Sequence, residues 1–341
     1  MKRVIIEKHG GQEALSFQDS DIPEPGPGEV RVKLKTMALN HLDLWVRRGV
    51  QGHRFPLPIV PGCDGAGIID AVGEGVPKEL LNMETLFSPG FSCGQCQHCM
   101  NNDDPLCAKY GILGETCDGT CSEFVIVRQQ QCLPKPSSVS WEEAAAFPLS
   151  SVTSASMLEK ANLKTGETLL VIAGTSGVGS MAVQMGKMRG SHVIATGSTE
   201  EKRDKAIDLG ADHTIDPSQE QWWKTVKQIT NGNGADVIFE NVGEATWEQS
   251  LLALAKGGRL TTCGATTGST VSIELKRLFF KNQQIIGSTM GSRKLLKDLL
   301  EPFAQRKLVP LIDGVYPFKD LVAAHERMES RQSIGKIVIR F

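Results

Sequence analysis

The sequence has no run of 18 consecutive apolar residues, so no segment of it is long enough to cross a bilayer as a helix. Its first ten residues, MKRVIIEKHG, turn polar before the apolar core of a signal peptide can form. We therefore expect a cytoplasmic protein with no membrane partner.

Two further features are missing. The formal net charge is only -2, and Lys and Arg are scattered without a basic stripe, which argues against nucleic acid as a partner. The nine cysteines form no disulfide framework, because four crowd into one loop and the others lie far apart. This distribution indicates a metal site and otherwise reduced thiols.

A length of 341 residues with 40% hydrophobic residues indicates a globular chain of two domains. Up to residue 140 the pattern is that of short β-strands: a Pro/Gly turn precedes the alternating Val30, Val32 and Leu34, and glycines interrupt the β-branched runs of residues 59–76. We expect a barrel-like β domain here.

The pattern changes at Ser140, a predicted helix N-cap, and strands and helices then alternate. Strands are expected in ETLLVIAG, HVIAT, 213–215, ADVIFE, GRLTTC and QQIIGS, and helices in VGSMAVQMGKM, 200–209, 220–230 and 246–255. This rhythm predicts a doubly wound parallel sheet of the Rossmann type. One more helix is expected at 294–306, and the final KIVIRF reads as a strand that returns to the first domain.

A glycine-rich turn lies where the first strand of this series meets its helix. It consists of Gly174, Thr175, Ser176, Gly177, Val178 and Gly179. Glycines let the backbone approach a pyrophosphate, and the helix start offers free N–H groups and a positive dipole end. The alternative is an ordinary tight turn; the strand before it and the helix after it favour dinucleotide binding.

The second strand ends without the acidic residue that binds the ribose 2′-hydroxyl of NAD. Gly197 leaves room there, Ser198 and Thr199 offer hydrogen-bond donors, and Lys202 or Arg203 supplies positive charge. The segment therefore predicts NADP(H), although Lys202 and Arg203 are also compatible with a merely solvated helix face.

Four cysteines, Cys93, Cys96, Cys99 and Cys107, have the spacing C-x2-C-x2-C-x7-C. This spacing allows four thiolates to converge on one zinc ion in a closed, structural site, with His98 as a bystander. An iron–sulfur cluster is the alternative, but nothing else in the sequence indicates electron transfer.

Together these features resemble the medium-chain dehydrogenase/reductase superfamily over nearly the whole chain. The landmarks are NHLD at 40–43, GCDGAG at 62–67, the cysteine loop, the region of Thr153, GTSGVG at 174–179, ENVG at 240–243 and GKIVI at 335–339. The resemblance implies a GroES-like β-barrel catalytic domain of residues 1–150 and 293–341 and a Rossmann domain of residues 151–292. Within the superfamily the chain is similar to quinone oxidoreductases and zinc-type alcohol dehydrogenase-like proteins.

The chain departs from the superfamily's alcohol dehydrogenases at each ligand of the catalytic zinc. Cys-His becomes Asn40-His41, Gly-His-Glu becomes Gly62-Cys63-Asp64, and the third Cys becomes Leu149. Neutral Asn and Leu cannot replace thiolates, so an open three-ligand zinc site is not expected. Cys63 and Asp64, with His41, remain candidates for a weak metal site.

The resemblance also implies roles for individual residues. Asn40 is placed to bind the substrate oxygen or the nicotinamide ribose, Asp43 to orient its loop, and Cys63 is either a reactive thiol or a small core residue. Contacts with the cofactor are implied for His41, Thr153, Asn241, Gly243 and Lys336. No proton donor is visible.

Without a Lewis acid, hydride addition from NADPH to a quinone or α,β-unsaturated carbonyl is better supported than alcohol oxidation. Two alternatives stay open: a zinc alcohol dehydrogenase with atypical ligands, and a non-catalytic NADPH-binding protein. The strand QQIIGST is expected at a sheet edge, which predicts a homodimer or homotetramer.

Overall fold

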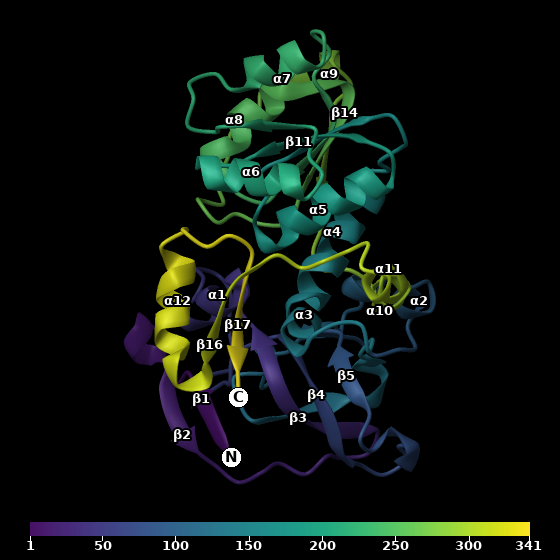
Figure 1. Cartoon of the computed structure of the whole chain (residues 1–341), viewed down its shortest axis with the longest axis vertical. Helices are drawn as coiled ribbons and strands as arrows, with labels where there is room; N and C mark the ends of the chain where they lie inside the picture. The colour runs from purple at the N-terminus through teal and green to yellow at the C-terminus, as the bar shows by residue number, and fades with distance from the viewer. The chain divides into compact units, whose positions relative to one another are not determined.

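The computed structural model describes residues 1–341 and divides the chain into two compact units. The first domain comprises Met1–Leu149 and Gly291–Phe341, and the second comprises Ser150–Met290. These limits lie one or two residues from those expected from the sequence. Both chain termini belong to the first domain (Figure 1).

The first domain is built on a seven-stranded sheet with the order β16-β17-β3-β4-β5-β9, in which β8 also pairs with β3. Its strands are β3 (Glu29–Ala38), β4 (Asp64–Val72), β5 (Glu84–Phe87), β8 (Phe124–Arg128), β9 (Cys132–Pro134), β16 (Ile312–Pro317) and β17 (Lys336–Arg340). Two small hairpins accompany it, β1 (Lys2–Ile5) with β2 (Ser16–Asp19) and β6 (Gly90–Phe91) with β7 (Gly111–Ile112). The β-rich first domain expected from the sequence is confirmed.

The register of three strands decides which residues meet. Strand β3 is antiparallel to β4 and β17, so its last residue, Ala38, lies opposite Asp64 at the start of β4 and Val338 in the middle of β17. The closing strand therefore does return to the first domain. Gly67 in β4 is required by close packing, because a Cβ there would lie 2.2 Å from the Lys33 carbonyl oxygen.

Short helices complete the first domain: α1 (His41–Arg48), α2 (Gln97–Met100), α3 (Trp141–Ala146), α10 (Arg293–Asp298), α11 (Leu300–Ala304) and α12 (Leu321–Glu329). Single 3-10 turns lie at Gln12–Ala14, Lys78–Leu80, Asp104–Leu106, Gln129–Gln131 and Phe318–Asp320. The Ser140 side chain caps α3 by accepting from the Glu143 N–H, as expected.

The single helix expected at 294–306 is wrong. The structure has two helices, α10 and α11, which meet at Leu299. Pro302 explains the break, because it has no N–H to donate and its ring would clash with the carbonyl of Asp298, four residues earlier, in a continuous helix.

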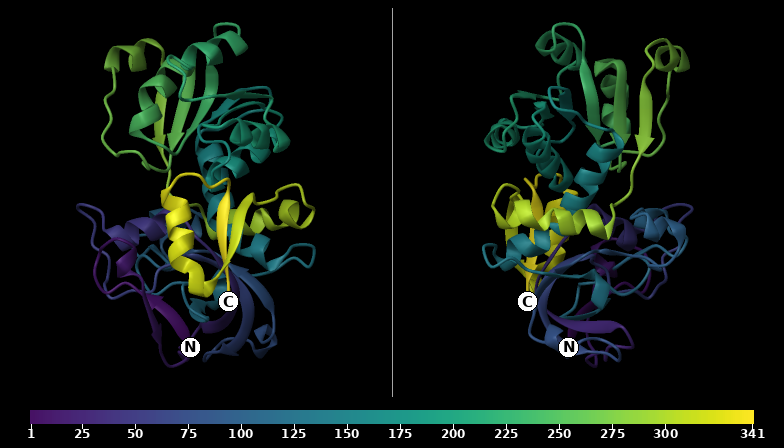
Figure 2. Two further views of the ribbon diagram at one scale, coloured as in Figure 1. Left: turned by 60° about the vertical axis from the view of Figure 1, so that its left-hand side comes forward. Right: turned by 90° about the vertical axis from the view of Figure 1, so that its right-hand side faces the viewer.

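The second domain is a parallel six-stranded sheet with the order β12-β11-β10-β13-β14-β15. Its strands are β10 (Thr168–Val171), β11 (His192–Thr196), β12 (His213–Ile215), β13 (Ala235–Glu240), β14 (Leu254–Thr262) and β15 (Gln284–Gly287). Its helices are α4 (Pro148–Lys160), α5 (Gly177–Met188), α6 (Glu200–Asp208), α7 (Trp223–Ile229), α8 (Glu244–Ala253) and α9 (Leu275–Phe280). Helices flank the sheet (Figure 2), and the order is that of a Rossmann fold.

This order confirms the doubly wound fold and places β15 at the sheet edge, as the sequence predicted. The strands are buried on both faces, with Leu169, Leu170, Ile194, Ile238 and Leu260 fully inaccessible. None of the helices is both long and apolar enough to traverse a bilayer. A cytoplasmic location stays a prediction.

We expect Phe303→Ala to destabilise the first domain by about 3–5 kcal/mol, because it empties a buried site. The Phe303 ring is inaccessible and stacks on Phe147 with centroids 3.9 Å apart. Phe17, which is 45% exposed, provides a matched control whose replacement by Ala should cost about 1 kcal/mol or less. Urea titration with hydrogen exchange of β3 and β4 measures both, and equal losses would contradict the assignment.

Candidate functional site

Asn40 lies between the end of β3 and the start of α1, where it is the N-cap residue of that helix. Its side chain is turned into the first domain and is 7% exposed. The amide nitrogen donates to Cys63 Sγ (3.3 Å) and to Asp64 Oδ2 (3.0 Å), and the amide oxygen accepts from Lys336 Nζ (2.5 Å). Asn40 therefore joins three other candidate residues in one polar cluster.

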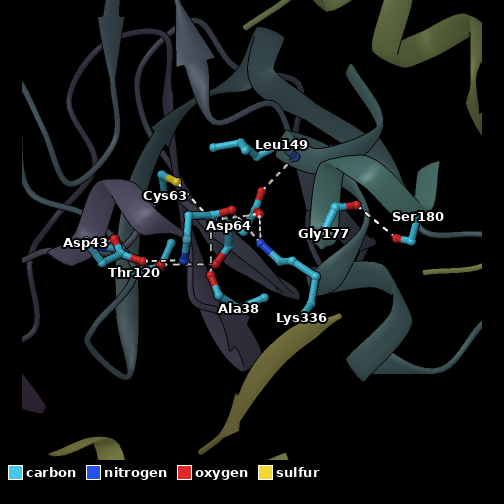
Figure 3. A network of polar contacts seen from close by, with 11 residues as sticks. Ala38, Asp43, Cys63, Asp64, Thr120, Leu149, Gly177, Ser180 and Lys336 are labelled. Carbon is cyan, nitrogen blue, oxygen red and sulfur yellow. Dashed lines mark hydrogen bonds and ion pairs between the residues drawn. The ribbon is translucent and has the colours of Figure 1, made fainter. Parts of the chain in front are cut away.

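Asp64 is the centre of this cluster and is fully buried (Figure 3). Its Oδ1 accepts from the backbone N–H of Leu149 at 3.0 Å, and its Oδ2 accepts from Asn40 and from the Lys336 ammonium, also at 3.0 Å. Thr120 Oγ1 donates to the Asp64 carbonyl oxygen at 3.0 Å. The antiparallel register of β3 with β4 and β17 brings these residues together from distant parts of the chain.

The donor set of this cluster does not fit a catalytic zinc ion. Asn40 presents an amide, Leu149 has an apolar side chain, and both carboxylate oxygens of Asp64 are engaged in hydrogen bonds. Burial raises the pKa of the Cys63 thiol well above its ordinary value, with the nearby Asp64 and Asp43 adding to the effect. A zinc tripod needs deprotonated ligands, and these positions supply none that is free.

Asp43 organises the backbone around the cluster. Its carboxylate accepts from the N–H of Asn40 (2.7 Å) and from the N–H of Gly62 (3.0 Å), which ties the start of α1 to the loop before β4. Burial raises the pKa of Asp43 to about 7, against the lowering effect of these N–H groups and of Lys336. His41, the first residue of α1, is exposed.

The four cysteines predicted to bind a metal do converge. Their Sγ atoms all lie within 4.8 Å of one another, with Cys93 and Cys99 at 3.8 Å and Cys96 and Cys99 at 3.5 Å. Two Zn–S bonds of about 2.3 Å at a tetrahedral angle separate their sulfurs by roughly 3.8 Å. Backbone N–H groups of Gln95 and Cys96 lower the pKa of Cys93 to about 6, which favours the thiolate. The cluster fits one structural zinc, and His98 is exposed beside it.

The glycine-rich turn forms the expected junction between β10 and α5. Ser176 caps α5 by accepting from the Gly179 N–H at 3.0 Å, and the first-turn N–H groups of Gly177 and Val178 have no intrahelical acceptor. A Cβ at Gly179 would lie 2.1 Å from the Ala173 carbonyl oxygen, so only glycine fits there. These N–H groups are suited to a pyrophosphate.

After β11 the structure has no acidic side chain before α6 begins. Ser198 and Thr199 are exposed, and the Thr199 hydroxyl caps α6 by accepting from the Lys202 N–H. Arg203 already makes contacts within the protein, since its guanidinium donates a hydrogen bond to the Gly197 carbonyl at 2.9 Å and lies 3.4 Å from the Asp216 carboxylate. A Cβ at Gly197 would lie 3.0 Å from Arg203, which favours glycine at this position.

Other cofactor candidates lie at the carboxyl ends of the parallel strands. Asn241 follows β13 and donates to the Ile172 carbonyl at 2.9 Å, and Gly243 has φ +91, which favours glycine. The Thr153 hydroxyl in α4 is buried without a hydrogen-bond partner, a feature suited to a bound polar ligand. These residues and the glycine turn belong to the second domain; His41 and Lys336 belong to the first.

Sequence reasoning missed two features of the site. The Lys336 ammonium joins Asn40 and Asp64, although the sequence resemblance suggested only a cofactor contact for it. Glu240, at the end of β13, accepts from the N–H groups of Val242 and Gly243, and burial raises its pKa. A charged residue at the end of the apolar run ADVIF was a usable signal for Glu240, whereas Lys336 depends on strand register.

We expect one zinc ion per chain, held by the cysteine cluster. Cys107→Ser should abolish zinc binding, measured by elemental analysis, because a closed four-thiolate site loses its charge and geometry together. Cys132→Ser is the matched control, since Cys132 lies outside the cluster and should leave the zinc content unchanged. Iron with visible absorption in place of zinc would contradict the assignment.

Asp43 should make the first domain less stable at high pH. Its folded pKa of about 7 lies above the ordinary value of 3.8, so folding takes up a proton between these values. This stabilising contribution is complete below pH 3.8 and is lost as pH rises through 7, for a total of about 4 kcal/mol. Asp43→Asn removes it, and hydrogen exchange of β3 and β4 at several pH values measures the difference. The control is Asp19→Asn, at an exposed position; parallel profiles for wild type and Asp43→Asn would refute the prediction.

Comparison with known proteins identifies the family. Residues 26–137 match the alcohol dehydrogenase GroES-like domain, and residues 177–305 match the zinc-binding dehydrogenase domain. A zinc-type alcohol dehydrogenase-like protein of Schizosaccharomyces pombe is 32% identical, with 100% of this chain and 99% of that protein covered. A quinone oxidoreductase of Pseudomonas aeruginosa is 29% identical, with 99% of each chain covered. The crystal structure of an NAD-dependent alcohol dehydrogenase superposes with a TM-score of 0.96 at 40% identity, covering 100% of both chains. The chain is therefore an oxidoreductase of the medium-chain dehydrogenase/reductase superfamily.

Proposed function

We propose that this protein is an NADPH-dependent reductase that adds hydride to a quinone or an α,β-unsaturated carbonyl compound without a catalytic zinc. The observation that carries the proposal is the cluster of Asn40, Cys63, Asp64 and Lys336, which supplies one ammonium and no free thiolate tripod. Similarity to a quinone oxidoreductase along the whole chain supports the acceptor class.

The second domain supplies the groups that would hold the dinucleotide. The N–H groups of Gly177 and Val178 suit its pyrophosphate, and Thr153, Asn241 and Gly243 suit the nicotinamide end. The bound dihydronicotinamide contributes the hydride. No acidic residue lies between β11 and Ser198 or Thr199, and Lys202 follows in α6; these three residues favour a 2′-phosphate and hence NADPH over NADH.

The chemistry follows from what the cluster can stabilise. Removal of hydride from an alcohol requires an alkoxide, whose localised charge is normally held by a metal ion. Addition of hydride to a conjugated carbonyl or a quinone places charge on an oxygen within a delocalised system, and positioning with modest polarisation is sufficient. The first-domain cluster suits the second reaction.

The proposal predicts NADPH oxidation with a quinone or enone that survives removal of accessible metal by chelation. With saturating acceptor, kcat/KM for NADPH should exceed that for NADH at least about tenfold. This is the ratio expected when NADH lacks a single charge contact that NADPH makes through its 2′-phosphate. Metal-dependent turnover of simple alcohols would instead support an atypical zinc alcohol dehydrogenase. Tight NADPH binding with no turnover across a broad carbonyl panel would support a non-catalytic binding protein.

We also propose that the second domain mediates a homodimer through the edge strand β15. Leu275, Phe279 and Phe280 in α9, the helix before this edge, are 66%, 60% and 73% exposed. An unpaired edge next to exposed apolar side chains is a surface that a second copy can cover. Light scattering should give a particle of twice the chain mass. Phe280→Glu should lower this mass toward that of the monomer, whereas Phe17→Glu should leave it unchanged. A wild-type protein that is monomeric at micromolar concentration would contradict the proposed dimer.

A further inference from the structure

Glu240, the last residue of β13, is a fully buried carboxylate whose hydrogen-bond donors are all neutral. Its Oε1 accepts from the N–H groups of Val242 (2.7 Å) and Gly243 (3.1 Å). Its Oε2 accepts from the hydroxyls of Thr246 (2.8 Å) and Ser250 (3.4 Å) in α8. These four donors compensate for the hydration that the carboxylate lost on burial.

The same bonds fix the loop between β13 and α8. Gly243, the N-cap residue of α8, has φ +91, and a Cβ there would lie 2.5 Å from the Gly268 carbonyl oxygen. The Val242 carbonyl accepts from the N–H (2.9 Å) and the hydroxyl (2.8 Å) of Thr267, which follows β14. Glu240 therefore holds one side of a loop whose other side is held by the segment after β14.

The order of the sheet decides which half of a dinucleotide meets this loop. Strand β10, which leads into the glycine turn, lies between β11 and β13. A dinucleotide with its pyrophosphate at that turn extends one nucleoside over the end of β11 and the other over the end of β13. Ser198 and Thr199 at the end of β11 suit a 2′-phosphate, so the nicotinamide nucleoside belongs over β13 and its loop.

We propose that Glu240 is a positioning residue whose carboxylate holds loop 241–243 in the conformation that binds the nicotinamide half of NADP(H). This inference rests on the proposed function and adds to it a buried residue that acts through the loop. When the carboxylate cannot reach the loop, the two N–H groups lose their acceptor and the loop samples other conformations. The nicotinamide then binds less tightly and hydride transfer, which depends on geometry, slows. The adenosine end over β11 is unaffected.

Two substitutions separate the reach of Glu240 from its charge. Glu240→Asp keeps the charge but shortens the side chain by one methylene, so the carboxylate no longer spans the loop N–H groups and the α8 hydroxyls. Glu240→Gln keeps the reach, because its oxygen can accept from the loop and its amide can donate to the hydroxyls. Glu248→Gln is the matched control, since it removes an exposed carboxylate from α8.

Isothermal titration calorimetry measures the dissociation constants of NADPH and of adenosine 2′,5′-bisphosphate, which lacks the nicotinamide half. We expect Glu240→Asp to weaken NADPH binding at least about tenfold, because buried donors lose their acceptor. The bisphosphate constant should change less than about twofold, and Glu240→Gln and Glu248→Gln should stay within about threefold of wild type for both ligands. If Glu240→Asp weakens both ligands equally, or neither, the positioning role is wrong.

Hydrogen exchange gives a readout without ligand. The amides of Val242 and Gly243 should exchange at least about tenfold faster in Glu240→Asp, while β10 and β11 keep wild-type protection. Faster exchange throughout the second domain would make Glu240 a general stability residue and overturn the proposal. If Glu240→Asp does not fold, Thr246→Val decides, because it removes one donor to Glu240 and keeps the side-chain shape. It should weaken NADPH binding about threefold or more without affecting the bisphosphate; no change contradicts the proposal.

The outcomes distinguish this inference from the proposed function. Glu240-dependent NADPH binding by a wild type that reduces no acceptor supports the positioning role and refutes the reductase. Turnover by wild type with equal NADPH affinity in Glu240→Asp keeps the reductase and overturns the role of Glu240. If wild type prefers NADH, the pair NADH and 5′-AMP replaces the two ligands, so the test of Glu240 does not depend on the 2′-phosphate. A wild type that binds no dinucleotide overturns both proposals.

Discussion

The ion pair between Asp64 and Lys336 is the interaction on which the first-domain site depends. Moving two charges out of water is costly, and such a pair is tolerated only when hydrogen bonds satisfy both partners. Here both Asp64 oxygens are satisfied, by the Leu149 N–H on one side and by Asn40 and Lys336 on the other. Removing either charged partner leaves the other unpaired, so the pair fixes the ends of β3, β4 and β17 with respect to one another.

This pair also limits the chemistry of the site. Zinc is a dication that exchanges ligands and can hold a substrate alkoxide directly. An ammonium is monovalent, is tethered to β17 and already shares its charge with Asp64. Such a group stabilises delocalised negative charge better than it generates a localised alkoxide, and this difference is the basis of the proposed reduction of conjugated acceptors.

The second domain was largely predictable because the sequence patterns that specify its strands, helices and glycine turn each lie within a short segment. Apolar runs flanked by helical periodicity identified β10 to β14, and the glycine turn marked the β10–α5 junction without any knowledge of the rest of the chain. The order of the sheet then follows from right-handed crossovers. The helix expected at 294–306 was wrong for a local reason that the sequence did contain, namely Pro302.

The polar cluster was only half predictable, because it depends on register between strands that lie far apart in the sequence. Asn40, Cys63 and Asp64 were named from the sequence as site residues, and Lys336 was named only as a cofactor contact. Lys336 is 296 residues from Asn40, and no periodicity predicts their contact. Since side chains alternate across a sheet, a shift of one residue between β17 and β3 would turn Lys336 to the opposite face. The cysteine loop shows the opposite case, because its ligands lie within 93–107.

The cysteine loop fits a metal ion and the polar cluster does not, and the distance along the sequence between the residues of each site helps to explain this. The cysteine loop forms its site from a single short segment, so folding of that lobe and metal binding are one event, and loss of one thiolate removes both. The polar cluster is assembled by the β-sheet itself, from the end of β3 and the starts of β4 and β17. The backbone hydrogen bonds of the sheet hold its frame, and the Asp64–Lys336 pair fixes the strand ends. Ligands at positions 40, 63 and 149 can therefore change, provided that another cation, here Lys336, balances the buried carboxylate of Asp64.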